Sequence, residues 1–211
     1  EVIKVLKSTH LTQGETVPRF ETEINKKVNS KFSVAVNSAT SALHIACEAC
    51  DLKKGDYLWT SPITFVASAN CALYCGAKVD FVDIEPSTGL ISIDKLSQKL
   101  LKAKREGKLP KVLVPVHLTG NPCQMFEIFK LSQKYDFKII EDASHAIGAK
   151  YKDKYIGNCE YSDITIFSFH PVKIITTGEG GLATTNDPEL ARKMRSFRTH
   201  GITKEEKYFE N

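Results

Sequence analysis

The stretch KVLVPVHLTGNPCQMFEIFKLSQKYDFKIIEDAS (111–144) reads, in order, as an apolar strand, a helix and a second apolar strand. KVLVPVH (111–117) and FKIIEDAS (137–144) are short, nearly continuous apolar runs, which is typical of strands that are covered on both faces. MFEIFKLSQKYD (125–136) repeats its apolar residues at helical spacing. A strand, a helix and a strand in this order predict a parallel sheet with helices packed on it.

The same alternation continues toward the N-terminus. The patterns predict strands at 33–38, 56–62 and 78–84, and helices at 40–50, 65–76 and 94–106. The first residues, EVIKVLKS, also have a helical pattern. We therefore expect an α/β protein in three layers, α/β/α, with a mainly parallel sheet.

Beyond residue 144 the rhythm changes. SDITIFSFH (162–170) and GGLATTND (180–187) are both strand-like, and the chain between them leaves no room for a long helix. Part of the sheet is therefore expected to be mixed. DPELARKMRSFRTHG (187–201) predicts a last helix, with Asp187 as N-cap and Pro188 at its first position.

Composition excludes several classes of protein. A net charge of +4 over 211 residues is small, and the basic patch KAKREGKLPK (102–111) lacks the aromatic or glycine-rich neighbours of a nucleic-acid reader. No apolar run approaches the roughly 18 residues that a membrane-spanning helix needs. The sequence shows no signal peptide, so we expect a cytoplasmic protein.

Six cysteines raise the question of a metal site. Cys47 and Cys50 form a C-x-x-C pair, and Cys71 and Cys75 follow. Zinc knuckles place turn residues between their ligands, whereas these cysteines lie in Ala- and Leu-rich helical patterns. Buried thiols in a reducing compartment are the favoured interpretation, no metal is expected, and zinc stays open as the alternative.

Ligands of open α/β sheets bind at the carboxyl ends of the strands. This rule selects Asn37–Thr40, Pro62–Phe65, His117, Asp142–His145 and Ser168–Lys173 as the segments in which to look for functional residues. The glycine fingerprint of dinucleotide sites is absent, because TTGEGG has the wrong spacing and leads into a strand.

Each candidate has a structural and a functional interpretation. Lys173 could extend to water or be a desolvated amine that forms a Schiff base. Asp142 could cap a loop or pair with a cationic ring nitrogen. Ser38 and Thr40 could merely begin a helix, or present free N–H groups to a phosphate. Phe65 could pack in the core or stack on a flat heterocycle.

Ser168 adds a hydroxyl for a phosphate. Together these residues supply what pyridoxal phosphate (PLP) requires, namely a lysine for its aldehyde, an acid for its ring nitrogen, a stacking ring and a phosphate cup.

The sequence also resembles the DegT/DnrJ/EryC1/StrS family of sugar aminotransferases, PLP enzymes of fold type I. The stretches that carry the resemblance run over nearly the whole chain: LTQGETVPRFE (11–21), NSATSALHIA (37–46), SPITFVASANCALYCGAKVDFVDI (61–84), PVHLTGNP (115–122), IIEDASHAIGAKYKDKYIG (139–157), FSFHPVKIITTGEGGLATTND (167–187) and RTHG (198–201).

The resemblance implies roles for individual residues. Lys173 would bind the cofactor aldehyde and move the proton, and Asp142 would pair with the pyridine nitrogen. His145 would lie near the ring hydroxyl. The phosphate would be held by Ser168 and the helix start at Ser38, Ala39 and Thr40, and Phe65 would stack on the ring.

Within the family, the motifs are most similar to the branch that acts in pseudaminic acid synthesis. This implies amination at C4 of a UDP-linked 4-keto-6-deoxy-N-acetylhexosamine, with L-glutamate as donor. A sister branch dehydrates at C3 and has a histidine in place of the lysine; here Lys173 is kept and His170 lies three residues before it. A PLP-dependent 3-dehydratase and a non-catalytic relative or fragment remain the alternatives.

The resemblance finally implies a domain organisation and a partner. Residues 1–211 would form the PLP-binding large domain with an N-terminal arm, without the family's small C-terminal domain. Family members are homodimers with shared active sites, so a homodimer is expected here.

Overall fold

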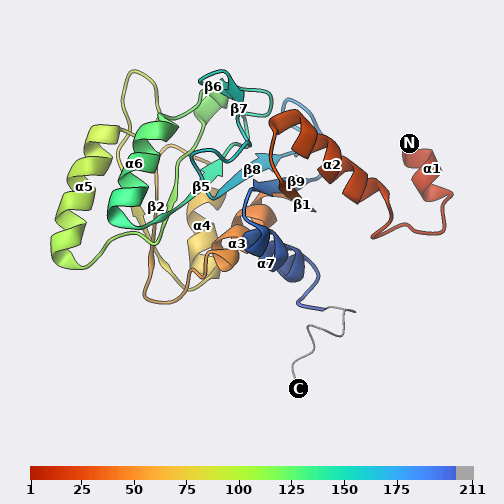
Figure 1. Ribbon diagram of the computed structural model, residues 1–211, viewed down its shortest axis with the longest axis horizontal. Helices are drawn as coiled ribbons and strands as arrows, with labels where there is room; N and C mark the ends of the chain where they lie inside the picture. Colours follow the sequence, from red (N-terminus) through yellow and green to blue (C-terminus); the bar gives the residue numbers. More distant parts are fainter. Residues whose placement is uncertain (203–211) are drawn as a thin grey trace.

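Seven strands form one sheet in the order β1-β9-β8-β5-β4-β2-β3 (Figure 1). The computed structural model describes residues 1–202. Neighbouring strands are parallel except where β9 pairs with β1 and β8, so the predicted mixed sheet is confirmed. The strands are β1 Phe32–Val36, β2 Tyr57–Thr60, β3 Lys78–Phe81, β4 Val112–Val114, β5 Lys138–Asp142, β8 Ile164–Ser168 and β9 Gly181–Thr185.

Helices cover both faces of the sheet, which confirms the predicted three layers. One face carries α3 Ala39–Ala49, α4 Ala67–Tyr74 and α7 Pro188–Arg198. The opposite face carries α2 Thr16–Val28, α5 Ile93–Glu106 and α6 Met125–Tyr135. Figure 1 shows α5 and α6 side by side, with α3 and α7 packed together elsewhere on the sheet.

Alternate strand residues enter opposite halves of the core, because successive side chains of a strand point to opposite faces. In β5, Ile139 packs on the α5–α6 side and Ile140 on the α3–α4 side. In β8, Phe167 faces α2 whereas Ile166 faces α3. All four side chains are buried, and each contributes roughly 1.5–3 kcal/mol of hydrophobic stabilisation.

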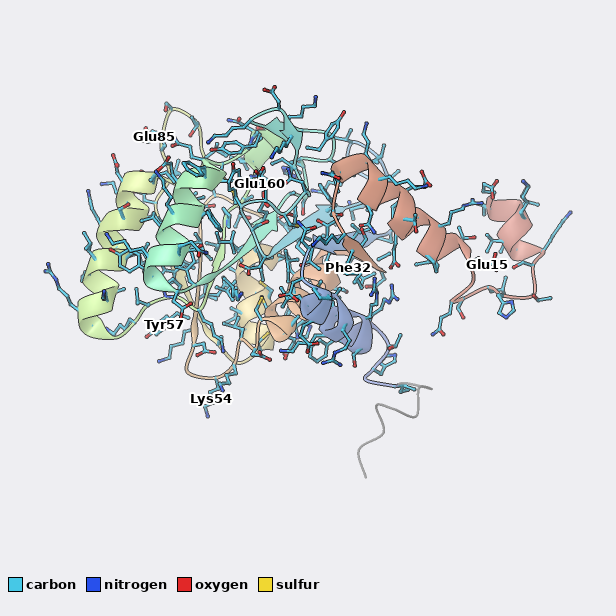
Figure 2. The ribbon with its side chains drawn as sticks, in the orientation of Figure 1. Glu15, Phe32, Lys54, Tyr57, Glu85 and Glu160 are labelled. Atoms are coloured by element: carbon cyan, nitrogen blue, oxygen red, sulfur yellow. The ribbon has the colours of Figure 1, made fainter. Side chains whose placement is uncertain are left out.

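The predicted caps of the last helix are confirmed. The carboxylate of Asp187 accepts hydrogen bonds from the N–H groups of Glu189 and Leu190, at 2.7 and 3.2 Å, and Pro188 occupies the first position of α7. Charged side chains in turns, such as those of Lys54 and Glu85, point away from the body of the protein (Figure 2).

Two parts of the fold were not predicted. Helix α2 contains Pro18 in its first turn and is strongly amphipathic, but its polar composition hid the pattern. The hairpin of β6 Lys150–Tyr151 and β7 Lys154–Tyr155 has strands of only two residues, too short to show periodicity. The short helix α1, Val2–Leu6, was expected from its pattern.

All six cysteines are free thiols, as the sequence suggested, and five of them are buried. Cys47 interacts with the thiols of Cys71 and Cys75 between α3 and α4, and these contacts and burial raise the pKa of Cys47 well above its ordinary value. Burial also raises the pKa of Cys159 to about 11. Over residues 1–202, no helix is both long and apolar enough to cross a membrane.

Candidate active site

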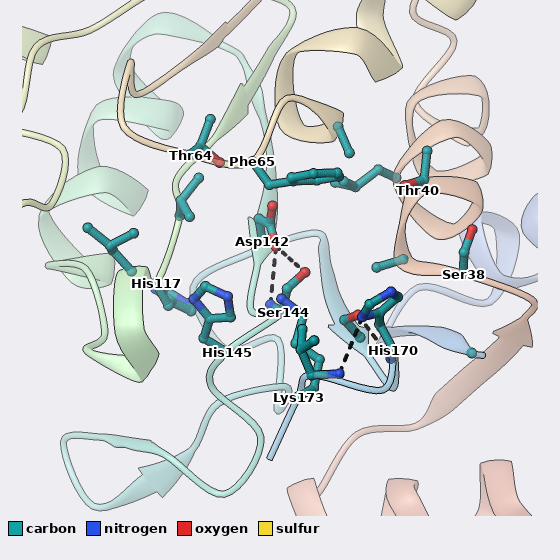
Figure 3. A pocket seen from close by; sticks show the side chains of 18 of the residues that line it. Ser38, Thr40, Thr64, Phe65, His117, Asp142, Ser144, His145, His170 and Lys173 are labelled. Carbon is teal, nitrogen blue, oxygen red and sulfur yellow. Dashed lines mark hydrogen bonds between the residues drawn. The ribbon is translucent and has the colours of Figure 1, made fainter. Parts of the chain in front are cut away.

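A cavity of about 240 Å³ opens at the carboxyl ends of the parallel strands (Figure 3). Its walls come from segments far apart in sequence, which follow β1, β2, β4, β5 and β8. All the candidate residues selected from the sequence line this one cavity: Ser38, Ala39, Thr40, Phe65, Asp142, His145, Ser168 and Lys173. The structure thus brings these residues together around one cavity.

The N-terminus of α3 forms one wall of the cavity. Ser38 is the N-cap, and its hydroxyl accepts a hydrogen bond from the N–H of Ser41 at 3.1 Å. The N–H groups of Ala39 and Thr40, in the first turn, have no acceptor within residues 1–202. These free donors and the positive end of the helix dipole make this wall suitable for an anion.

Gly181, the first residue of β9, allows α3 to begin where it does. A Cβ atom at residue 181 would lie 2.3 Å from the carbonyl carbon and oxygen of Ser38 and 2.4 Å from the nitrogen of Ala39. These are backbone atoms, which have little freedom to move aside. The glycine therefore lets the helix start pack directly against the sheet.

Asp142 ends β5 and is 5% exposed. Its Oδ1 accepts hydrogen bonds from the N–H and the hydroxyl of Ser144, at 3.1 and 2.6 Å. Its Oδ2 accepts one from the hydroxyl of Ser68, on α4, at 2.6 Å. Figure 3 shows the Ser144 bonds as dashed lines, with the Asp142 carboxylate facing the cavity. A fixed carboxylate of this kind is suited to pair with a cationic group.

Lys173 lies in the turn that follows β8 and is half-buried at the cavity. Its backbone N–H donates to the carbonyl of His170 at 2.9 Å. The sequence left two interpretations of Lys173 open, a side chain that extends to water or a desolvated amine. Val172 and Ile174 are 77% and 70% exposed, because the segment is a turn rather than a strand. Lys173 lines the cavity, as Val172 does.

Phe65 is 73% exposed and lines the cavity, so the interpretation as a core residue is wrong. It lies just before α4, which begins at Ala67. Ser168, the last residue of β8, is 6% exposed, and its hydroxyl accepts a long hydrogen bond from the N–H of His170 at 3.4 Å. Its own proton remains available to a ligand.

His145 lies three residues after Asp142 and also lines the cavity. Burial and the charge of Lys173 lower the pKa of His145 below its ordinary value, against the opposing effect of Asp142. The imidazole is therefore neutral at pH 7. Gly120, with φ +85°, allows the neighbouring turn to approach, since a Cβ there would lie 2.8 Å from the carbonyl oxygen of His145.

Three residues of the site were missed in the sequence: Thr64, Ser68 and Ser144. Ser68 is fully buried, and its only signal was a position three residues after Phe65 in a helix that follows a strand end. Thr64 and Ser144 fall inside the segments selected by the strand-end rule, but hydroxyl residues are common in loops. Nothing in the sequence showed that two of these hydroxyls converge on Asp142.

Comparison with known proteins gives concordant results. The family model described as the DegT/DnrJ/EryC1/StrS aminotransferase family matches residues 1–211. A UDP-4-amino-4,6-dideoxy-N-acetyl-beta-L-altrosamine transaminase from Campylobacter jejuni is 44% identical over 201 residues, which cover 95% of this chain and 52% of that protein.

Solved structures agree with this match. PseC from Helicobacter pylori, an aminotransferase of pseudaminic acid biosynthesis, superposes with a TM-score of 0.88 at 36% identity, covering 99% of this chain and 54% of that one. The structure of ntda from Bacillus subtilis with bound cofactor PMP gives a TM-score of 0.85 at 31% identity, covering 100% and 45%. The chain thus spans about half the length of these relatives. The chain belongs to the DegT/DnrJ/EryC1/StrS aminotransferase family.

Proposed function

We propose that this chain carries the cofactor-binding site of a PLP-dependent aminotransferase that aminates a nucleotide-linked 4-keto-6-deoxy sugar. The observation that carries the proposal is the convergence of Lys173, Asp142 and the free N-terminus of α3 on one cavity. Lys173 would hold the aldehyde of PLP, Asp142 its ring nitrogen, and the N-terminus of α3 its phosphate. Residues 1–211 would act as the large, cofactor-binding domain.

The donors and acceptors present fit this cofactor. A carboxylate offers about four lone-pair positions, of which Ser68 and Ser144 occupy three on Asp142. One position on Oδ2 is left for a protonated ring nitrogen. At the other wall, the N–H groups of Ala39 and Thr40 and the hydroxyl of Ser168 would all donate to a phosphate.

When bound, PLP supplies an aldehyde for an amine and a ring that withdraws electrons from the donor's Cα. The other roles belong to this chain. Lys173 would bind the aldehyde through Nζ and, once released, carry the proton between the donor and the cofactor. Asp142 would keep the ring nitrogen protonated. His145, neutral at pH 7, would hydrogen-bond the ring hydroxyl. Phe65 would cover one face of the ring.

The substrate class follows from the relatives. The Campylobacter jejuni protein is named for a UDP-linked 4-amino-4,6-dideoxy-N-acetyl sugar, and PseC for pseudaminic acid synthesis. We therefore propose a UDP-linked 4-keto-6-deoxy-N-acetylhexosamine as acceptor and L-glutamate as donor. The PMP of the Bacillus subtilis relative is the aminated form of PLP and supports the choice of cofactor.

A homodimer and a cytoplasmic location complete the proposal. Phe65 and Val172 line the cavity and their sequence neighbours Val66 and Ile174 are also exposed, and exposed apolar side chains of this kind favour a protein partner. A second copy would cover these side chains. Free thiols throughout the chain support a reducing compartment.

The test of the cofactor site is covalent labelling with PLP. Purified wild type, Lys173→Ala and Lys54→Ala are each mixed with PLP, reduced with borohydride, digested and analysed by mass spectrometry. Lys54, exposed in a turn, controls for adventitious surface labelling. We expect stoichiometric label on Lys173 in wild type and Lys54→Ala, with a near-UV to violet absorbance band that Lys173→Ala lacks. Equal labelling of wild type and Lys173→Ala contradicts the proposal.

The reaction is tested separately with glutamate and a panel of UDP- and dTDP-linked 4-ketosugars. Formation of the 4-amino sugar with stoichiometric 2-oxoglutarate supports amination. A product that has lost the C3 oxygen without gaining nitrogen indicates the dehydratase alternative instead.

A further inference from the structure

The strongest unassigned feature of the cavity is the chain of hydroxyl groups behind Asp142. The hydroxyls of Thr64 and Ser68 are 2.7 Å apart, and the Ser68 hydroxyl is 2.6 Å from Asp142 Oδ2. Ser68 is completely buried, whereas Thr64 is half-buried at the cavity wall. The three groups come from the β2–α4 connection, from α4 and from the end of β5.

The direction of the hydrogen bonds follows from the inventory of donors. The Ser68 hydroxyl has two acceptors in reach, the Asp142 carboxylate at 2.6 Å and the backbone carbonyl of Phe65 at 3.3 Å, and its single proton points to the nearer carboxylate. Ser68 then has no proton left for Thr64, and Thr64 must donate to Ser68. Each bond polarises the next, so that Ser68 becomes a stronger donor than an isolated hydroxyl.

Ser144, two residues after Asp142, binds the other oxygen of the Asp142 carboxylate. Its N–H and its hydroxyl both donate to Oδ1, at 3.1 and 2.6 Å. Asp142 thus receives donors on both oxygens, from two sides. A carboxylate held at both oxygens has one orientation, which leaves an Oδ2 lone pair for a ligand.

We infer that Ser68, supported by Thr64 and opposed by Ser144, is a positioning residue for the reaction: it fixes the orientation of the Asp142 carboxylate, with one Oδ2 lone pair directed at the ring nitrogen of PLP. The inference rests on the proposed function, because it assigns Asp142 to that nitrogen. A merely structural Ser68 would satisfy a buried carboxylate and have no effect on the ligand.

The test compares Ser68→Ala, Thr64→Val and Ser144→Ala with wild type. The control is Ser132→Ala, because Ser132 is also buried but its hydroxyl donates to the carbonyl of Phe129 on α6, away from the cavity. Three quantities are measured: the dissociation constant of PLP, the thermal midpoint, and the ¹⁵N signal of ring-labelled PLP as a function of pH. The ¹⁵N signal reports protonation of the ring nitrogen and does not depend on turnover.

We expect Ser68→Ala to weaken PLP binding about tenfold, because Asp142 is then held less firmly in the orientation that meets the ring nitrogen. The ring nitrogen of PLP bound to this variant should also titrate at a pH where the signal of PLP bound to wild type is constant. Thr64→Val and Ser144→Ala should show smaller changes in the same direction, and Ser144→Thr, which keeps the hydroxyl at a half-buried position, should restore the wild-type signal. Ser132→Ala should bind PLP as wild type does.

The outcomes separate this inference from the proposed function. If wild type shows no Lys173-dependent binding of PLP, both are wrong. If wild type binds PLP and Ser68→Ala lowers only the thermal midpoint, with the dissociation constant and ¹⁵N titration unchanged, only the positioning role is wrong. If Ser68→Ala does not fold, the half-buried Thr64 and Ser144 variants decide, and wild-type ¹⁵N titrations in both contradict the inference.

Discussion

His117 Nε2 lies 2.7 Å from Glu141 Oε2, and both side chains are buried. The backbone N–H of Cys123 donates to Nδ1 of the same ring at 3.1 Å, so the ring proton is on Nε2 and is donated to Glu141. Glu141 precedes Asp142 on β5 and therefore points to the opposite face of the sheet. The pair joins the segment after β4 to β5, and His117 is among the residues that line the cavity.

The pH dependence of the free energy of unfolding should show how much the His117–Glu141 pair stabilises the fold. Burial would raise the pKa of Glu141, but hydrogen bonds from His117, Ser162 and Thr165 outweigh it and lower that pKa below the ordinary value. A lowered folded-state pKa means that the stabilisation is present in full above the unfolded value of about 4.3 and is lost as the pH falls through the folded value. Glu141→Gln lacks this contribution.

We therefore expect Glu141→Gln to be less stable than wild type by about 2 kcal/mol at pH 7, with the difference shrinking below about pH 4. Urea unfolding between pH 7 and 3, followed by the fluorescence of Trp59, measures it; Trp59 is the single tryptophan and is 1% exposed. A difference that stays constant down to pH 3 would show that ionised Glu141 is not the cause.

Substitution of Gly181 should displace the anion-binding wall. In Gly181→Ala the new methyl group meets the backbone of Ser38 and Ala39 at 2.3–2.4 Å, so the start of α3 must move. We expect a loss of about 1–3 kcal/mol in stability, as for other overpacked sites, together with weaker binding of PLP and of inorganic phosphate. Thermal unfolding and phosphate titration measure the two effects.

Gly14→Ala is the matched control, because a Cβ at residue 14 meets only His10, at 3.4 Å, and no positive φ intervenes. This variant should match wild type in both measurements. If Gly181→Ala binds phosphate as tightly as Gly14→Ala does, the N-terminus of α3 is not the phosphate wall.

The sequence identified the layers and the cavity lining because both follow from local patterns. Apolar runs such as VLV (112–114) mark buried strands, and the ends of parallel strands meet at one edge, so Asp142 and Ser168 could be assigned to one site. The burial of individual side chains could not be read in this way. Phe65 and Val172 are apolar but exposed, since the loops that carry them lie at the rim.

Contacts between segments that are far apart in the chain could not be predicted from the sequence either. Ser68 and Asp142 are 74 positions apart, and their hydrogen bond depends on how α4 packs on the sheet that contains β5. The same is true of Glu21, whose carboxylate meets Arg198 at the far end of the chain. A single sequence contains no signal for such pairs, because each residue has an ordinary local role on its own.

Removal of Arg198 should destabilise the fold. Its Nη1 donates to Glu21 Oε1 at 2.6 Å and to the carbonyl of Ala35 at 3.2 Å, and thus joins α7, α2 and β1. Glu21 is 9% exposed and also accepts the N–H of Ala35 at 2.8 Å. Arg198→Ala leaves this carboxylate without its cation, so we expect a loss of about 2–3 kcal/mol in urea unfolding.

An exposed ion pair provides the comparison. Lys26 and Glu23 lie 2.8 Å apart on the surface of α2, where solvent screens the charges. Lys26→Ala should therefore change stability by less than about 0.5 kcal/mol. Equal effects of the Arg198 and Lys26 substitutions would contradict the assignment of Glu21 as a buried, paired carboxylate.

Phe65 should affect the ligand and not the fold. Because its side chain is 73% exposed, Phe65→Leu removes little buried contact, and we expect the thermal midpoint to stay within experimental error of wild type. An aromatic ring that stacks on the cofactor contributes about 1 kcal/mol beyond its area, so the dissociation constant of PLP should rise about fivefold. Phe81→Leu, an exposed phenylalanine on β3 outside the cavity, should leave PLP binding unchanged. Fluorescence titration with PLP measures all three proteins, and indistinguishable affinities would rule out stacking by Phe65.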